Sequence, residues 1–223
     1  SSINSILWGQ VIAFDWSLPV HFIQDGEPMP EGDLLANPTI NERSYRAMCL
    51  RIFKICNHNT KSSAHCQPFN IVHCNMDSNN VVAKYLQETF NSSSLDKRFF
   101  SYTGNSYLDD FGDKRLVYVS PYATESLNEE DMANSHETVF IFNPYAELMG
   151  LRHRVLKEMF HLKAQQEQKL NVHFRRMPIQ EWININGHVV ISHYIQCLRD
   201  VLQGDSWLKA MHRHISKRYI VSS

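Results

Sequence analysis

Two stretches decide the fold class: LVYVSPYATES at residues 116–126 and TVFIFNPYAE at residues 138–147. Each starts with four or five β-branched, aromatic or aliphatic residues and then breaks into polar and turn-forming residues. Such short apolar runs predict strands that are buried on both faces of a parallel sheet. Ligands of parallel sheets bind beyond the carboxyl ends of the strands, so we expect a functional site at segments 120–126 and 143–147.

The rest of the chain alternates between similar apolar runs and helical patterns. Further strands are predicted at 11–15, 68–75 and 171–174, with a candidate short strand at 98–100. Strands that alternate with helices indicate an α/β fold, with a mostly parallel sheet flanked by helices. At 223 residues and 43% hydrophobic composition, the sequence predicts a single domain over residues 1–223.

Helices are predicted where apolar residues recur at helical spacing. A capping box, Thr39-x-x-Glu42, opens the first helix, and Asp77 or Ser78 caps the second. Gly204 ends the helix that starts near residue 190, and Asp205 or Ser206 caps the last one. Segments 19–38, 57–67 and 91–113 are predicted loops. One face of the helix after residue 147 is predicted to be buried through Leu148, Leu151, Val155, Met159 and Leu162.

The charge distribution is uneven although the net charge is −1. Residues 148–223 hold 12 Lys and Arg against 5 Asp and Glu, a balance of +7, whereas residues 1–147 hold 10 against 18, a balance of −8. A basic C-terminal third favours an anionic partner, and it is equally typical of an ordinary exposed helical face. The sequence leaves both interpretations open.

Cysteine usage and the chain ends bear on location. The five cysteines are odd in number and fall mostly within apolar patterns, which favours a reducing compartment over a disulfide framework. No apolar run approaches the ~18 residues that cross a bilayer. Because the chain starts Ser1-Ser2-Ile3 without a methionine, we expect it to be one domain of a longer protein whose N-terminal region carries any targeting segment.

Chemically active residues are scattered, and no nucleotide-binding or serine-hydrolase motif is present. The Cys and His pairs between residues 56 and 74 are adjacent and lack the CxxC spacing of zinc sites, so no metal is predicted. Asp15, Glu125 and Glu147 stand at or near predicted strand ends, where a carboxylate serves as a general acid or base, or simply as a helix cap. The pairs Arg175-Arg176 and Lys217-Arg218 fit phosphate contacts, or an exposed basic face.

The order of several segments resembles that of the SPOUT-class methyltransferases that modify N1 of the purine at tRNA position 9. The stretch PFNIVHCN at 68–75 is similar to the family's second strand, and segment 116–126 to its strand and acidic loop. Segment 139–147 stands where the family has a strand, a glycine-containing loop and an Asp. Segments 177–183 and 186–198 are similar to its Leu-Pro-Leu-Asp segment and to its Asn-rich loop with the following helix. Segments 207–210 and 217–218 match its closing helix and its basic end. The resemblance spans most of the chain and is greatest to the methyltransferase-like subunit of animal mitochondrial ribonuclease P.

This resemblance implies a C-terminal trefoil knot, S-adenosylmethionine as methyl donor, tRNA as substrate, and Glu147 as the base that accepts a proton. It also implies a mitochondrial matrix location, a dehydrogenase-like partner and a separate metal-dependent nuclease for tRNA 5′-end processing. The residues it assigns to the RNA are Arg175, Arg176, Lys217 and Arg218. The residues it assigns to the donor are Ser120, Tyr122, Asn143, Pro144, Tyr145, Ile179, Asn186, His188 and Val190.

The departures from the family pattern fall within the expected site. Asn143-Pro144 replaces a glycine-bearing pair, and proline fixes φ and lacks an N–H donor. Glu147 replaces an Asp and is one methylene longer, which displaces the base by about 1 Å. In the Leu-Pro-Leu-Asp segment the acid is shifted or lost, at Gln180 and Glu181. Two hypotheses follow: an active methyltransferase, or a catalytically inactive RNA-binding scaffold whose donor site is degenerate. A further hypothesis is that the chain is an α/β protein unrelated to RNA.

Overall fold

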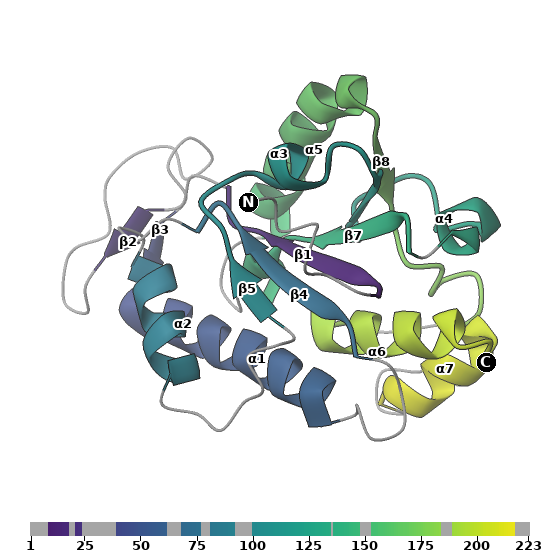
Figure 1. The fold of residues 1–223 in the computed structure, drawn as a ribbon, viewed down its shortest axis with the longest axis horizontal. Helices are drawn as coiled ribbons and strands as arrows, with labels where there is room; N and C mark the ends of the chain where they lie inside the picture. Colours follow the sequence, from purple (N-terminus) through teal and green to yellow (C-terminus); the bar gives the residue numbers. More distant parts are fainter. Residues whose placement is uncertain are drawn as a thin grey trace.

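A six-stranded parallel sheet forms the centre of the protein, in the order β5-β4-β1-β7-β6-β8 (Figure 1). The structure, a computed structural model, describes residues 9–17, 21–23, 39–61, 68–76, 81–91, 100–134, 136–147, 153–183 and 189–216. The predicted fold class, a mostly parallel sheet flanked by helices, is confirmed. The strands of this sheet are β1 (Val11–Asp15), β4 (Asn70–Cys74), β5 (Phe100–Tyr102), β6 (Arg115–Val119), β7 (Thr138–Phe142) and β8 (Val172–Arg175).

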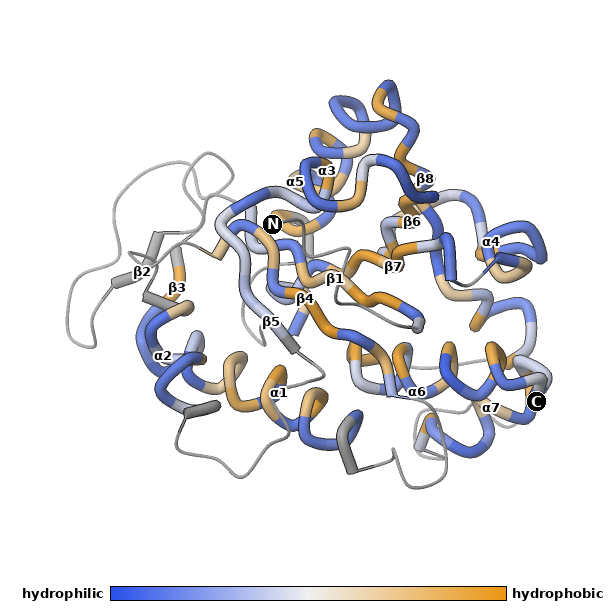
Figure 2. Tube along the Cα trace, viewed as in Figure 1, coloured by the Kyte–Doolittle hydropathy of each residue, from blue (hydrophilic) through white to orange (hydrophobic). Residues whose placement is uncertain are grey.

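Helices cover both faces of the sheet. On one face lie α1 (Glu42–Lys61), α2 (Val81–Asn91), α6 (Ile191–Leu202) and α7 (Trp207–His214). On the other lie α3 (Tyr107–Phe111) and α5 (His153–Glu167). Successive strand residues point to opposite faces, so Ile12 packs with the first group and Ala13 with the second. Every residue of β1, β4 and β7 is therefore buried, and Figure 2 shows apolar residues concentrated along the strands.

The first helix starts later than its predicted capping box. Residues Thr39–Asn41 form a short strand, β3, which pairs in parallel with β2 (His21–Ile23) inside the segment predicted as loop. The helix begins at Glu42, and the Asn41 side chain accepts a hydrogen bond from the Ser44 backbone N–H at 2.9 Å. Asn41 is as good a cap as Thr39, and the strand pairing of Thr39 decides between them.

Other predicted boundaries were also wrong. Helix α1 continues to Lys61 because the buried Asn59 side chain bonds both backbone groups of Phe69, at 2.8 and 3.0 Å. The candidate strand at 98–100 lies instead at Phe100–Tyr102, where it pairs with β4. Leu162 was predicted to be buried and is 60% exposed, whereas Val155 and Met159 are buried as expected. Two short helices, α3 and α4 (Glu129–Ala133), were missed; each starts with a capping box, at Ser106 and Asn128.

The strand order reverses at the centre of the sheet. The chain runs from β1 outward through β4 to β5, and then crosses to β6, β7 and β8 on the other side of β1. Ligands of open α/β sheets bind beyond the carboxyl ends of the strands at such a reversal. The loops after β6 and β7 lie there, the second as a 3-10 helix, η4 (Pro144–Glu147). Another 3-10 helix, η5 (Gln168–Leu170), joins α5 to β8.

Two predictions concern connections that are only partly described. The trefoil knot depends on segments 148–152 and 184–188, which lie outside the described residues, so it stays a prediction. The caps predicted at Asp77 and Ser78 also lie outside them, whereas the cap at Ser206 is confirmed by its bond from the Lys209 N–H.

None of the helices in the described ranges has the length and apolar run needed to cross a membrane.

Candidate active site

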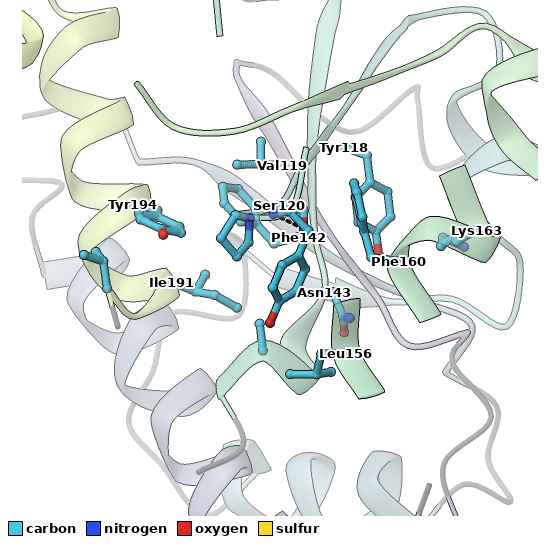
Figure 3. A pocket seen from close by; sticks show the side chains of 14 residues that line it. Tyr118, Val119, Ser120, Phe142, Asn143, Leu156, Phe160, Lys163, Ile191 and Tyr194 are labelled. Atoms are coloured by element: carbon cyan, nitrogen blue, oxygen red, sulfur yellow. Dashed lines mark hydrogen bonds between the residues drawn. The ribbon is translucent and has the colours of Figure 1, made fainter. Parts of the chain in front are cut away.

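The loops after β6 and β7 meet at one cavity beyond the carboxyl ends of these strands (Figure 3). We call it the strand-end cavity. Val119, Ser120, Phe142 and Asn143 come from the strand ends, and Figure 3 shows side chains from α5 and α6 closing around them. Residues of segments 120–126 and 143–147 therefore line one cavity, and the functional site expected there stays a prediction. The remaining lining residues are Tyr118, Pro121, Tyr122, Ala146, Leu156, Phe160, Lys163, Val189, Ile191 and Tyr194.

The side chains of the strand-end cavity suit an aromatic ligand, but the cavity is too small to hold one. Its walls are apolar and aromatic, and Ser120 and Asn143 add a hydroxyl and an amide, which is typical of small-molecule sites. The cavity volume is about 20 Å³, room for about one water. Sites for drug-sized ligands have volumes of about 300–1,000 Å³. A nucleoside-sized ligand therefore requires side chains of the lining to move.

The loop after β7 uses its own backbone donors internally. Pro144 has no N–H, and the Tyr145 N–H donates to the Asn143 side-chain Oδ1 at 2.9 Å. The Ala146 N–H donates to the Asn143 carbonyl at 3.1 Å. Proline at the first position of a helical turn is favourable because its fixed φ suits the turn. The loop is therefore a stable 3-10 turn with few backbone donors left for a ligand.

Glu147, the predicted base, is 3% exposed at the end of η4. Its Oε1 accepts a hydrogen bond from the backbone N–H of Ile191, the first residue of α6. Its Oε2 lies 3.9 Å from Arg51 Nη1, and the same nitrogen donates to the Glu147 main-chain oxygen at 2.5 Å. Burial raises the pKa of Glu147, and the Ile191 N–H and the Arg51 charge offset part of this rise. A carboxylate with a raised pKa is a stronger proton acceptor.

A second cavity, of about 510 Å³, opens on the Glu147 side between α1 and α6. We call it the basic cavity, because Arg51, Lys54 and Arg199 line it and Glu147 is the one carboxylate among its described lining residues. The two cavities share a thin wall. Ala146 and Ile191 line the strand-end cavity, while their chain neighbours Glu147 and Val190 line the basic cavity. The other residues that line the basic cavity are Ile55, His58, Ser192, His193, Ile195 and Gln196.

The residues predicted to bind the donor fall into different places. Ser120, Tyr122 and Asn143 line the strand-end cavity. Val190 lines the basic cavity instead. Asn186 and His188 lie outside the described residues. The three others, Pro144, Tyr145 and Ile179, are buried and line neither cavity; Tyr145, for example, packs edge-on against Trp16 with ring centroids 5.6 Å apart.

Several lining residues were missed by the sequence analysis. Ile191 and Tyr194 lie in the helix predicted to start near residue 190, and no sequence pattern distinguishes a core tyrosine from one that lines a cavity. The α1 cations Arg51 and Lys54 lie three positions apart, a spacing that places them on one face of a helix. That spacing was the available signal for the basic cavity.

The other candidate carboxylates are structural. Asp15 is fully buried, 3.0 Å from Lys163 Nζ, and accepts hydrogen bonds from Tyr118 Oη at 3.2 Å and Asn75 Nδ2 at 3.1 Å. These contacts join β1 to α5 and β6, so Asp15 has a structural role. Glu125 is on the surface, where it pairs with Arg175. Glu125 lines a separate cavity of about 390 Å³ together with Arg175, its ion-pair partner, whereas Glu147 lines a cavity of about 510 Å³ next to the strand-end cavity.

The structure pairs Arg175, predicted to contact a phosphate, with carboxylates of the protein itself. Arg175 is 9% exposed, and its Nε lies 2.9 Å from the fully buried Asp131, which also binds Arg115 Nη2 at 2.8 Å. A guanidinium already neutralised by carboxylates has little to offer a phosphate. Arg176 is paired with Glu181 at 2.6 Å. Lys217 and Arg218 lie outside the described residues, so their assignment to the RNA stays a prediction.

The cysteines and histidines show no metal arrangement within the part of the chain that the structure describes. Cys49, Cys56, Cys74 and Cys197 are free and buried. Burial raises the pKa of the Cys49 and Cys197 thiols to about 12, which makes them poor nucleophiles and poor metal ligands. His65 and Cys66 lie outside the described residues.

Comparison with known proteins finds relatives by structure alone. No family model and no curated protein matches the sequence. Among solved structures, full-length spTrm10 in complex with SAH has 19% identity and a TM-score of 0.58, and the alignment covers 93% of this chain and 99% of that one. The chain has the Trm10 fold. A further spTrm10 structure has a TM-score of 0.60 at 15% identity, with 94% and 96% covered. A dual-specific Trm10 from Thermococcus kodakaraensis has a TM-score of 0.51 at 13% identity, with 92% and 99% covered.

Proposed function

We propose that this protein is an S-adenosylmethionine-dependent methyltransferase that modifies N1 of the purine at position 9 of a tRNA. One observation carries the proposal: a buried carboxylate, Glu147, stands between a strand-end cavity and an open basic cavity. The Trm10 fold supports it, because one of the spTrm10 structures holds SAH, the product form of the donor. No metal is required, since the donor is itself activated.

The residues of the strand-end cavity would hold the donor. Aromatic and aliphatic side chains such as Phe142 and Tyr194 would enclose its adenine, and Ser120 and Asn143 would bond its polar groups. When bound, the sulfonium donor supplies a methyl group whose bond to sulfur breaks with the electron pair going to sulfur. The chain contributes orientation, and it excludes water from the transfer.

Glu147 would take the proton that the purine loses as the new carbon–nitrogen bond forms at N1. Its Oε1 is fixed by the Ile191 N–H, so Oε2 is the proton acceptor, on the side of the basic cavity. The raised pKa of Glu147 suits this task because a stronger base takes the proton more readily. The purine would therefore approach through the basic cavity, and the donor through the strand-end cavity.

The test is methylation of tRNA transcripts that differ only at position 9. With purified protein and donor, transcripts carrying a purine at position 9 should gain a modification that blocks base pairing and stops reverse transcription at that position. Transcripts with a pyrimidine there should gain none. Equal modification of both, or modification elsewhere, would overturn the proposed target.

A second candidate function, an RNA-binding scaffold without methyl transfer, is favoured by the closed strand-end cavity. Its volume is about 20 Å³, and Pro144 and the internally bonded amides of Tyr145 and Ala146 leave few donors for a ligand. In this case the protein would hold tRNA for 5′-end processing by a separate nuclease. The mitochondrial location, the ribonuclease P role and the dehydrogenase-like partner belong to this proposal and rest on the sequence resemblance.

Reconstituted cleavage distinguishes the two candidates. A scaffold should increase 5′-end cleavage of a precursor tRNA by the metal-dependent nuclease in the absence of any methyl donor. A protein that acts only as a methyltransferase should leave the cleavage rate unchanged, with or without the dehydrogenase-like subunit.

A further inference from the structure

The basic cavity, with a volume of about 510 Å³, is not accounted for by the donor. Helix α1 contributes Arg51, Lys54 and His58 to it, and helix α6 contributes His193 and Arg199. The cations of two helices thus converge on this cavity, with one carboxylate, Glu147, among its described lining residues. An ordinary basic face spreads its cations over a convex surface, where water screens them. Here the cations line a concave site, which concentrates positive potential.

The deepest cation is held in place before any ligand arrives. Arg199 is 5% exposed, its Nη2 donates to Asn59 Oδ1 at 2.8 Å, and its guanidinium lies 5.3 Å from the ring centroid of Phe69. A fixed guanidinium loses little conformational entropy on binding an anion, so its contribution is larger than that of a mobile surface side chain. At the mouth of the cavity, Lys54 is exposed.

Arg51 links this cavity to the proposed base. It holds the Glu147 main-chain oxygen and lies 3.9 Å from the Glu147 carboxylate, while it also lines the cavity. An anion bound beside Arg51 would therefore lie next to the carboxylate that receives the proton. The size of the cavity suits a nucleotide, with a phosphate at the cations and a base near Glu147.

We infer that the basic cavity binds a backbone phosphate of the RNA strand next to the target purine. This inference rests on the proposed function, since Glu147 identifies the side from which the purine approaches. A phosphate presents several acceptor oxygens to the Arg and Lys donors, and a single RNA strand can enter a cavity that a stiff duplex cannot. The shared chemistry is a phosphate ester, so a free nucleotide is the alternative source.

The experiment reverses one charge in the cavity and one outside it on the same helix. Lys54→Glu places an acid at the cavity mouth, and Arg43→Glu places one on an exposed part of α1 that does not line the cavity. Both residues are exposed, so the two variants should keep the melting temperature of the wild type. A second comparison uses double variants that remove charge. The cavity variant combines Arg51→Gln and Lys54→Gln, and its control combines Arg43→Gln and Arg46→Gln.

Binding of fluorescent tRNA is measured by anisotropy at several salt concentrations. The cavity variants should weaken binding by about tenfold or more, and the slope of log affinity against log salt should fall by about 0.7–0.9 for each phosphate that the variant no longer neutralises. The controls should stay within about twofold of the wild type. Equal losses of affinity in cavity and control variants would overturn the inference. So would displacement of the tRNA by adenosine monophosphate with the same dependence on Lys54, which would assign the cavity to free nucleotides.

Failure of the proposed function would look different. If the wild type bound tRNA through Lys54 yet transferred no methyl group, the phosphate site would stand, but the methyltransferase proposal and the placement of that phosphate next to a target purine would fail. If the wild type methylated tRNA and Lys54→Glu matched Arg43→Glu in binding and rate, the methyltransferase proposal would stand and this inference would fail.

Discussion

Replacing Glu147 with Gln should slow methyl transfer while leaving the fold intact. The amide keeps the shape of the side chain, and its Oε1 can still accept the Ile191 N–H. It cannot accept a proton. A positioned general base contributes roughly 10²–10⁴ in rate, so the barrier should rise by about 2.7–5.4 kcal/mol. Donor affinity should be unchanged, because Glu147 lines the basic cavity and not the strand-end cavity.

Although Glu147→Gln should slow methyl transfer, it should not lower the stability of the fold. Burial raises the pKa of Glu147 above its ordinary value of 4.5, so the native state keeps this proton over a pH range in which the unfolded chain has released it. The free energy of unfolding of the wild type should therefore fall as the pH rises through that range. Glu147→Gln has no such proton, so it should be at least as stable as the wild type at neutral pH. A less active and more stable variant is typical of a functional site.

Single-turnover methylation as a function of pH, together with urea unfolding, provides the assay. The wild-type rate should increase with pH through an apparent pKa above 4.5, and the variant should lack that step. Glu137→Gln is the matched control, since the Glu137 side chain is 72% exposed, and it should behave as wild type. A variant that methylates at the wild-type rate would refute the assignment of Glu147 as base. A Glu147→Gln variant that unfolds at a lower urea concentration than the wild type would show that the carboxylate has a structural role.

Three further predictions concern the strand-end cavity, the buried ion pairs and the basic surface. Restoring glycine with Asn143→Gly and Pro144→Gly should free backbone donors and raise donor affinity by about 1–3 kcal/mol in calorimetry; no gain would mean that the loop is not what limits binding. Asp131→Ala should lower the free energy of unfolding by about 3–5 kcal/mol in urea, because it leaves the buried Arg175 and the half-buried Arg115 without their shared carboxylate. Glu130→Ala, which removes an exposed partner of Arg115, should cost at most about 1 kcal/mol, and equal destabilisation by both variants would contradict the distinction. Lys217→Ala with Arg218→Ala should flatten the salt dependence of tRNA binding by up to about 0.9 log unit for each phosphate that these side chains neutralise, and an unchanged slope would exclude the C-terminal tail from the interface.

The sheet and the place of the site could be predicted because their signals are local. Runs such as TVFIF have no polar position after the first, so they fit only a strand covered on both faces, and β7 is one. Because the carboxyl ends of parallel strands lie at one edge, the turn residues after β6 and β7 indicated where the loops meet. Both arguments need only neighbouring residues and the rule for parallel sheets.

The orientation of the site residues could not be predicted, because it depends on segments far apart in the sequence. Glu147 faces the basic cavity because Arg51, from a helix near the start of the chain, binds its carbonyl. Arg175 looked like a free cation next to Arg176, yet it is neutralised by Asp131 from a helix that the sequence analysis missed. Tyr122 and Tyr194 likewise line the same cavity, although one comes from the loop after β6 and the other from α6, far away in the sequence.

The central claim is that the strand-end cavity is a methyl-donor site, and calorimetric titration with S-adenosylmethionine tests it most directly. The closed cavity and the proline-containing loop predict saturable binding that is weak for the wild type and tighter for the double glycine variant. Enlarging the strand-end cavity by Tyr194→Ala should change the affinity for the donor, whereas Lys54→Glu in the basic cavity should leave that affinity unchanged. The absence of any binding heat at millimolar donor, in the wild type and in the glycine variant alike, would contradict the claim and leave the RNA-binding scaffold as the function of this fold.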